Sequence, residues 1–136
     1  MKKQKYVETI EKDGNYLAFV IRKGFNKPGC NFFPPDDFPL QLGIHLRMKG
    51  EKVMLHEHVP FKELKNLRVQ EFIYIESGKA KVGIFYKKSK IEIVILNKGD
   101  MILLNCAHYV EFTEKTKIIE IKQGPYRGKN EEKKYL

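Results

Sequence analysis

Short segments in which apolar and polar residues alternate, separated by turn residues, run through most of this 136-residue sequence. A period of two is typical of β-strands, because successive side chains point to opposite faces of a sheet. Almost nothing falls at helical spacing. Eight to nine evenly spaced strands favour a sandwich or a closed barrel, which leaves few exposed strand edges. The predicted strands are 16–21, 40–49, 52–58, 69–75, 79–86, 91–96, 101–104, 109–112 and 117–122.

A proline-rich segment, 24–39, interrupts this pattern. Proline lacks the backbone donor that a strand ladder needs, and its ring fixes φ. We therefore predict a long irregular loop here, lying across an opening of the barrel. The prolines are Pro28, Pro34, Pro35 and Pro39.

The length suits a single domain, so we predict one domain over 1–136. Its core is expected within 40–123, where the strand-like segments are densest. The N-terminal strand and the proline-rich loop occupy 1–39, and a polar tail occupies 124–136.

Basic residues outnumber acidic residues by 26 to 17, which gives a net charge of +9. The lysines gather at the termini and in a predicted turn, where charge runs are usually just exposed surface. We therefore expect an anionic small molecule as the partner, and neither nucleic acid nor a membrane.

Cysteine use and the apolar segments bear on the compartment. Cys30 and Cys106 make neither a dense disulfide framework nor a CxxC motif, and we expect them to act as small apolar side chains rather than as a redox pair or soft ligands. No apolar segment is long enough to span a bilayer, and none follows the initial Met-Lys-Lys as a signal peptide would require. A cytoplasmic protein is expected.

Two histidines, His56 and His58, lie two residues apart on the predicted strand 52–58. Both imidazoles would leave the same face with Cα atoms roughly 7 Å apart, a span that one metal ion can bridge. The simpler alternative is a pair of surface histidines. Downstream, Glu71 alternates in register with Ile73 and Ile75.

A carboxylate on such an apolar face is costly unless it is paired, protonated or bound to a cation. A metal ion would remove that cost at Glu71. The alternative is that Glu71 opens its strand at an end exposed to solvent.

The spacing Gly50-x5-His56-x-His58, followed by Glu71-x6-Gly78, resembles the first motif of the cupin family, G-x5-HxH-x3–4-E-x6-G. The gap between His58 and Glu71 is twelve residues instead of three or four, which predicts a longer loop between the ligand strands.

The second cupin motif, G-x5-P-x-G-x2-H-x3-N, is matched less closely. Gly99 opens it, but Asn105 stands where proline is usual and Ala107 stands where glycine is usual. His108 comes two positions early, and Phe112 replaces the final asparagine.

The resemblance implies an all-β fold, the double-stranded β-helix or jelly-roll barrel of cupins. It implies one divalent transition metal held by His56, His58, Glu71 and His108. Such an N3O donor set suits Fe, Mn, Ni, Co, Cu or Zn without choosing among them. A homodimer is also implied.

The C-terminal segment 118–126 is similar to small uncharacterised cupins associated with surface-polysaccharide and sugar-nucleotide biosynthesis. This resemblance implies isomerase or epimerase chemistry on a sugar phosphate or nucleotide sugar. His45, Arg47 and Lys49, on the preceding predicted strand, are candidates to bind phosphate or move a proton, although a structural role is the simpler interpretation for His45 and Arg47. Two alternatives stay open: a cupin dioxygenase using Fe(II), and a non-catalytic metal-dependent ligand-binding or sensor module.

Overall fold

The protein divides into two compact units in a computed structural model, which describes residues 2–62, 67–124, 127–128, 131 and 133–136. The larger unit comprises Met1–Phe25 and Val69–Leu136, and the smaller unit comprises Asn26–Arg68. The prediction of one domain over the whole chain stays a prediction.

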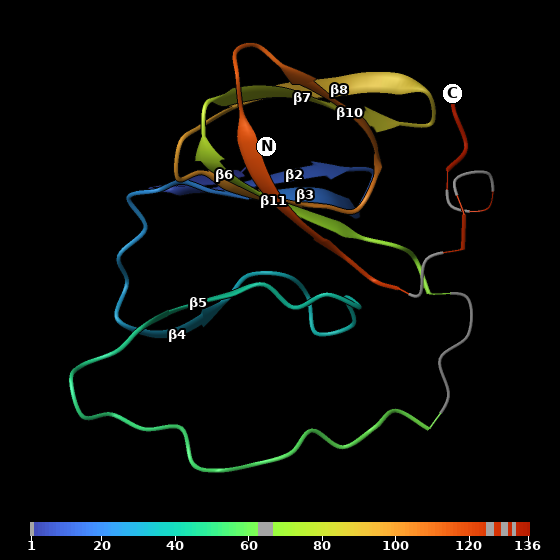
Figure 1. The fold of residues 1–136 in the computed structure, drawn as a ribbon. Coiled ribbons are helices and arrows are strands. Elements are labelled where there is room, and N and C mark those ends of the chain that lie inside the picture. Colours follow the sequence, from blue (N-terminus) through green and yellow to red (C-terminus); the bar gives the residue numbers. More distant parts are fainter. Residues whose placement is uncertain (1, 63–66, 125–126, 129–130, 132) are drawn as a thin grey trace. The chain divides into compact units, whose positions relative to one another are not determined.

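The larger unit consists of two antiparallel sheets (Figure 1). The first sheet has the strand order β1-β2-β3-β9-β6-β11, and the second has the order β10-β7-β8. Every recorded strand pairing is antiparallel. The strands are β1 (Lys2–Gln4), β2 (Val7–Lys12), β3 (Asn15–Ile21), β6 (Glu71–Ser77), β7 (Lys79–Tyr86), β8 (Ser89–Asn97), β9 (Met101–Leu104), β10 (Ala107–Phe112) and β11 (Lys117–Lys122).

The smaller unit contains one antiparallel pair, β4 (Gly29–Phe32) with β5 (Gly43–Leu46). Cys30 lies directly across from His45 in this pair.

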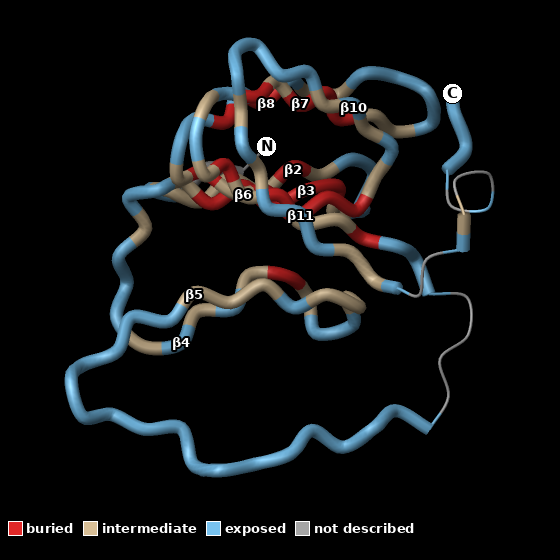
Figure 2. The backbone as a smooth tube through the Cα atoms, in the orientation of Figure 1, coloured by how far each residue is buried: buried red, intermediate tan, exposed pale blue. Residues whose placement is uncertain are grey.

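The core of the larger unit is a single cluster of buried apolar side chains contributed by both sheets. Figure 2 shows buried backbone in β3 and β6 of one sheet and in β7 and β8 of the other. Alternation supplies these side chains, because every second residue of a strand points toward the facing sheet. The cluster comprises Ile10, Leu17, Ala18, Val20, Ile73, Ile75, Ala80, Val82, Ile84, Val94, Leu96, Ile102 and Leu104.

The all-β prediction is confirmed, since the elements of the described residues are strands in antiparallel sheets. Three predicted strands have the observed bounds: 79–86, 101–104 and 117–122. The jelly-roll topology of cupins stays a prediction. In the part of the chain that the structure describes, no helix has the length and apolar character needed to cross a bilayer.

Three predictions about individual segments are wrong, and two N-terminal strands were missed. The N-terminal strands β1 and β2 were not predicted. The segment 24–39 is not wholly irregular, because β4 forms between Pro28 and Pro34, where no proline blocks the ladder. The strand predicted over 40–49 shortens to β5.

The predicted strand 52–58 does not form, and its residues are exposed. Val53 and Leu55 have relative exposures of 67% and 101%. Alternation of apolar and polar residues is not sufficient for a strand. A strand also needs a neighbouring strand to form hydrogen bonds with and a surface that covers its apolar side chains.

The turn between β6 and β7 requires a glycine. Gly78 has a φ of 91°, a conformation that side chains with a Cβ rarely adopt. A Cβ there would also lie 2.5 Å from the backbone oxygen of Lys115. Gly78 is the closing glycine of the spacing that resembles the first cupin motif, so a local backbone requirement accounts for that position.

A second glycine, Gly83, lies in the middle of β7 opposite Tyr109 of β10. The Tyr109 ring crosses Gly83 so closely that a Cβ would overlap it. The ring also contacts Phe85, with ring centroids 5.9 Å apart. Gly83, Phe85 and Tyr109 lie on the outward face of the second sheet. Their neighbours along β7, Val82 and Ile84, point into the core, and successive residues of a strand point to opposite faces.

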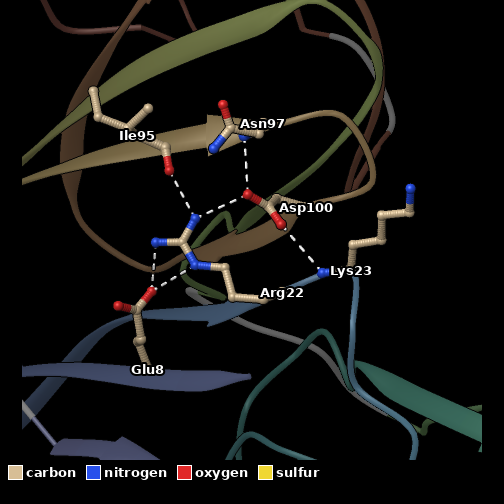
Figure 3. A network of polar contacts seen from close by, with 6 residues as sticks. All are labelled: Glu8, Arg22, Lys23, Ile95, Asn97 and Asp100. Carbon is tan, nitrogen blue, oxygen red and sulfur yellow. Dashed lines mark hydrogen bonds and ion pairs between the residues drawn. The ribbon is translucent and has the colours of Figure 1, made fainter. Parts of the chain in front are cut away.

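The guanidinium of Arg22 joins the two sheets at one end of the larger unit (Figure 3). Its Nε donates to Glu8 of β2 at 2.9 Å. Its Nη1 donates to the backbone oxygen of Ile95 on β8 at 2.7 Å and to Asp100 Oδ2 at 2.9 Å.

The Asp100 carboxylate, only 8% exposed, also accepts two backbone N–H groups. They come from Lys23 at 3.1 Å and from Asn97 at 2.9 Å. The carboxylate therefore fixes both the end of β3 and the turn between β8 and β9.

We predict that Asp100→Ala lowers the free energy of unfolding by about 2–4 kcal/mol, because it removes the acceptor of two backbone N–H groups and one of the partners of Arg22. Urea unfolding followed by circular dichroism measures the loss. The matched control is Glu76→Gln, which removes an exposed ion pair with Lys117 and should change stability by about 0.5 kcal/mol or less. Equal effects of the two substitutions would contradict the assignment.

Candidate functional site

Glu71 and His108 face each other from the two sheets of the larger unit. Glu71 begins β6 on the same face as the core residues Ile73 and Ile75. His108 lies on β10 opposite the buried Ile84. Their closest approach joins His108 Nε2 to Glu71 Oε2 at 3.6 Å, and the two side chains are 23% and 19% exposed. The structure thus brings together two of the four predicted metal ligands at one end of the core.

The imidazole of His108 is held by its own backbone. Its Nδ1 lies 2.8 Å from the carbonyl oxygen of Cys106. A carbonyl only accepts, so Nδ1 carries the proton and Nε2 is directed toward Glu71. Metal-ligating histidines commonly have this arrangement, in which a second partner fixes the tautomer and frees the other nitrogen.

Two further ionisable residues lie next to Glu71 at this end of the core: Glu120, which is exposed, and Lys122, which is half-buried. Strand β11 pairs with β6 so that Lys122 lies opposite Glu71 and Glu120 lies opposite Ile73. The Glu120 carboxyl is hydrogen-bonded to that of Glu71. The sequence analysis did not find these residues. Alternation does not mark Glu120, because Glu120 is exposed like its neighbours Ile119 and Ile121, whereas Ile118 and Lys122 are half-buried.

The pKa values of the three groups move in different directions. Burial raises the pKa of Glu71, but hydrogen bonds with His108 and Glu120 and the positive charges of His108 and Lys122 outweigh it, lowering that pKa to about 2. Burial lowers the pKa of His108, but contact with Glu71 outweighs burial and the net direction is upward. The hydrogen bond with Glu71 is the main reason that the pKa of Glu120 is raised. Glu71 is therefore ionised, while Glu120 and His108 retain their protons more strongly than usual.

A buried amide network supports the start of β6. Gln70 Nε2 donates to Asn105 Oδ1 at 3.0 Å, and Asn105 Nδ2 donates to the backbone oxygen of Tyr16 at 2.9 Å. The backbone N–H of Gln70 donates to Gln123 Oε1 at 2.8 Å. Asn105, which stands where the second cupin motif has proline, thus ties β3 to the residue that precedes Glu71.

The other two predicted ligands, His56 and His58, lie in the smaller unit and are exposed. They are not on a strand, so the reason given for their common direction is wrong. Their rings are nevertheless neighbours, with centroids 5.0 Å apart. His56 Nδ1 lies 2.8 Å from the backbone oxygen of Met54, which leaves Nε2 free for a ligand as in His108.

The complete four-ligand set stays a prediction. Among the described residues, no group of three or more His, Cys, Asp and Glu side chains is arranged to hold a metal ion. The donor chemistry of Glu71 and His108 does fit one. Two ligands at about 2.1 Å from a shared ion in tetrahedral geometry lie roughly 3.4 Å apart, close to the 3.6 Å that separates the two donor atoms.

The predicted catalytic residues His45 and Arg47 lie in the smaller unit, at β5 and directly after it. Both contact Cys30. Their role toward a substrate stays a prediction.

The chain matches no protein-family model, no curated protein and no solved structure.

From the Glu71–His108 pair we predict that the metal-free protein is most stable between about pH 4.5 and 6.5. These limits are the ordinary pKa values of a glutamate and a histidine side chain. The Glu71 contribution is present above the lower value and is lost as the pH falls toward about 2. The His108 contribution is present below the upper value and is lost as the pH rises through its raised pKa. Glu120, with its raised pKa, offsets part of the loss on the acid side.

Urea unfolding in the presence of a chelator, across this range and on both sides of it, tests the maximum. Glu71→Gln should flatten the profile and cost on the order of 2 kcal/mol near pH 5.5. The control Glu111→Gln alters an exposed carboxylate on the same strand as His108 and should retain the wild-type profile. A pH profile that Glu71→Gln leaves unchanged would show that the pair does not stabilise the fold.

Proposed function

We propose that this chain is a metal-dependent protein of cupin type whose Glu71 and His108 bind one divalent transition metal. The convergence of an ionised carboxylate and an oriented imidazole from facing sheets is the observation that carries the proposal. The participation of His56 and His58 rests on the motif spacing, with the free Nε2 of His56 as additional support.

Acid–base chemistry on a small anionic substrate is the proposed activity, in the form of an isomerase or epimerase acting on a sugar phosphate or nucleotide sugar. When bound, the metal would polarise a substrate carbonyl. The carboxyl of Glu120 holds its proton unusually strongly and lies beside Glu71, so Glu120 is the candidate general acid. Lys122 and the net charge of +9 favour an anionic ligand.

Metal binding is tested first. Protein without an affinity tag should contain about one metal ion per chain, and calorimetric titration of the chelated protein with Co²⁺ or Mn²⁺ should give the same ratio. His108→Ala and Glu71→Gln should weaken binding by about 10–100-fold, while Glu111→Gln should not change it. Affinity should rise as the pH rises through the raised pKa of His108, since only the neutral imidazole ligates.

Separate His56→Ala and His58→Ala variants test the ligands assigned from the sequence. Each should weaken binding if the imidazole contacts the same ion. Unchanged affinity in both variants would remove them from the ligand set, and no binding by the wild-type protein would disprove the metal centre.

Proton transfer is tested by NMR in D₂O with hexose phosphates and nucleotide sugars. Metal-loaded protein should introduce deuterium at the carbon next to the carbonyl, without dioxygen, and Glu120→Gln should slow this exchange by about 10²–10⁴-fold. Product formed only with Fe(II) and dioxygen would instead identify a dioxygenase. Tight binding with neither exchange nor product would identify a sensor module.

A further inference from the structure

The hairpin β4–β5 gathers a thiol, an imidazole and a guanidinium on one face. Cys30 and His45 are directly opposed across the strand pair, and Cys30 Sγ lies 3.3 Å from His45 Nδ1. Arg47 follows His45 by two residues, and its Nη2 donates to Cys30 Sγ at 2.7 Å. Cys30 is exposed to solvent. The sulfur therefore has a proton acceptor and a fixed cation as its neighbours.

Both partners of the sulfur are themselves held in place. Arg47 Nη1 lies 3.3 Å from Glu51 Oε2, and the other oxygen of Glu51 accepts the backbone N–H of Met48 at 3.2 Å. The edge of the Phe32 ring packs against the His45 ring, with centroids 5.7 Å apart.

Gly43 permits this packing of Phe32 on His45. The Phe32 ring crosses Gly43 so closely that a Cβ there would lie 2.6 Å from it. The face of the hairpin is thus built around the Cys30–His45 pair, with support on both sides.

We propose that Cys30 is a reactive nucleophile and a site of oxidation by hydroperoxides. A guanidinium has N–H donors and no acceptor, so Arg47 makes its hydrogen bond with a lone pair of the sulfur and stabilises the thiolate. His45 Nδ1, 3.3 Å from the sulfur, is placed to accept the thiol proton as the sulfur attacks, which makes the pair a nucleophile with an adjacent base.

In the reaction, the thiolate attacks the outer oxygen of the hydroperoxide. An S–O bond forms as the O–O bond breaks, and the departing alkoxide or hydroxide takes a proton and leaves as an alcohol or as water. Sulfur is oxidised by two electrons to the sulfenic acid level, and the peroxide is reduced by the same two electrons. The arginine beside the sulfur stabilises the negative charge that develops on the departing oxygen. This chemistry uses residues of the smaller unit alone and is independent of the proposed metal centre.

The test measures how fast Cys30 is oxidised in the full-length protein, with chelator present to exclude metal-catalysed oxidation. Hydrogen peroxide is the oxidant, dimedone traps sulfenic acid, and peptide mass spectrometry separates Cys30 from Cys106. We expect Cys30 to be labelled at least about tenfold faster in the folded protein than in urea-unfolded protein. Equal or slower labelling in the folded protein would overturn the proposal.

Variants of His45 and Arg47 test whether these two side chains cause the fast labelling of Cys30. Arg47→Met and His45→Gln should each slow Cys30 labelling by about tenfold or more, and Arg47→Lys should restore part of the rate because it keeps the positive charge. Lys49→Met removes a nearby charge from the same segment and should change the rate less than twofold. If Lys49→Met slows labelling as much as Arg47→Met does, general electrostatic attraction explains the rate and the specific cluster is disproved.

Discussion

The ion pair between Arg22 and Asp100 is the constraint on which the arrangement of the larger unit depends. The Asp100 carboxylate and the Arg22 guanidinium form hydrogen bonds with groups of β2, β8 and the end of β3 in place of hydrogen bonds with water. These hydrogen bonds form only when the two sheets are correctly placed against each other, because the partners of Arg22 are as far apart in the chain as Glu8 and Asp100. Apolar packing between the sheets is not directional, so this polar contact supplies specificity that the core alone lacks.

The candidate site uses the same principle at the Glu71 and His108 side chains. The apolar core tolerates a carboxylate there only because an imidazole from the other sheet and a second carboxyl, that of Glu120, share its charge and protons. The result is a group of ionisable side chains at one end of the apolar core whose pKa values depend on one another. Such groups are characteristic of binding and catalytic sites, although they also occur in purely structural networks.

Much of the fold could be predicted from the sequence, because alternation identifies strands whose neighbours cover one face, as in 79–86 and 117–122. It failed at 52–58, where the alternation is present but the described residues neither pair with this segment as a strand nor bury its side chains. The inward position of Glu71 also follows from alternation, whereas His108 was assigned from the resemblance to the second cupin motif and lies outside the predicted strand 109–112. Glu120 was missed because the inward face of its strand is decided by register with β6, a contact between chain segments far apart in sequence. Pairing of Cys30 with His45 depends in the same way on a strand that forms inside a proline-rich segment.

The contact between Gly83 and Tyr109 has a consequence for how the outer surface of the second sheet tolerates change. Tyr109 follows His108 directly in β10, and its side chain points outward over Gly83. The tyrosine and the candidate ligand therefore share one short stretch of backbone. Any side chain at Gly83 would have to displace the tyrosine ring from this position. Substitutions on this outward face, distant from the ionisable groups, are therefore expected to be constrained by the geometry of the opposite face. Gly83 is itself buried beneath the tyrosine ring, so a substitution there would act on the neighbour of a candidate ligand although it lies on the outward face.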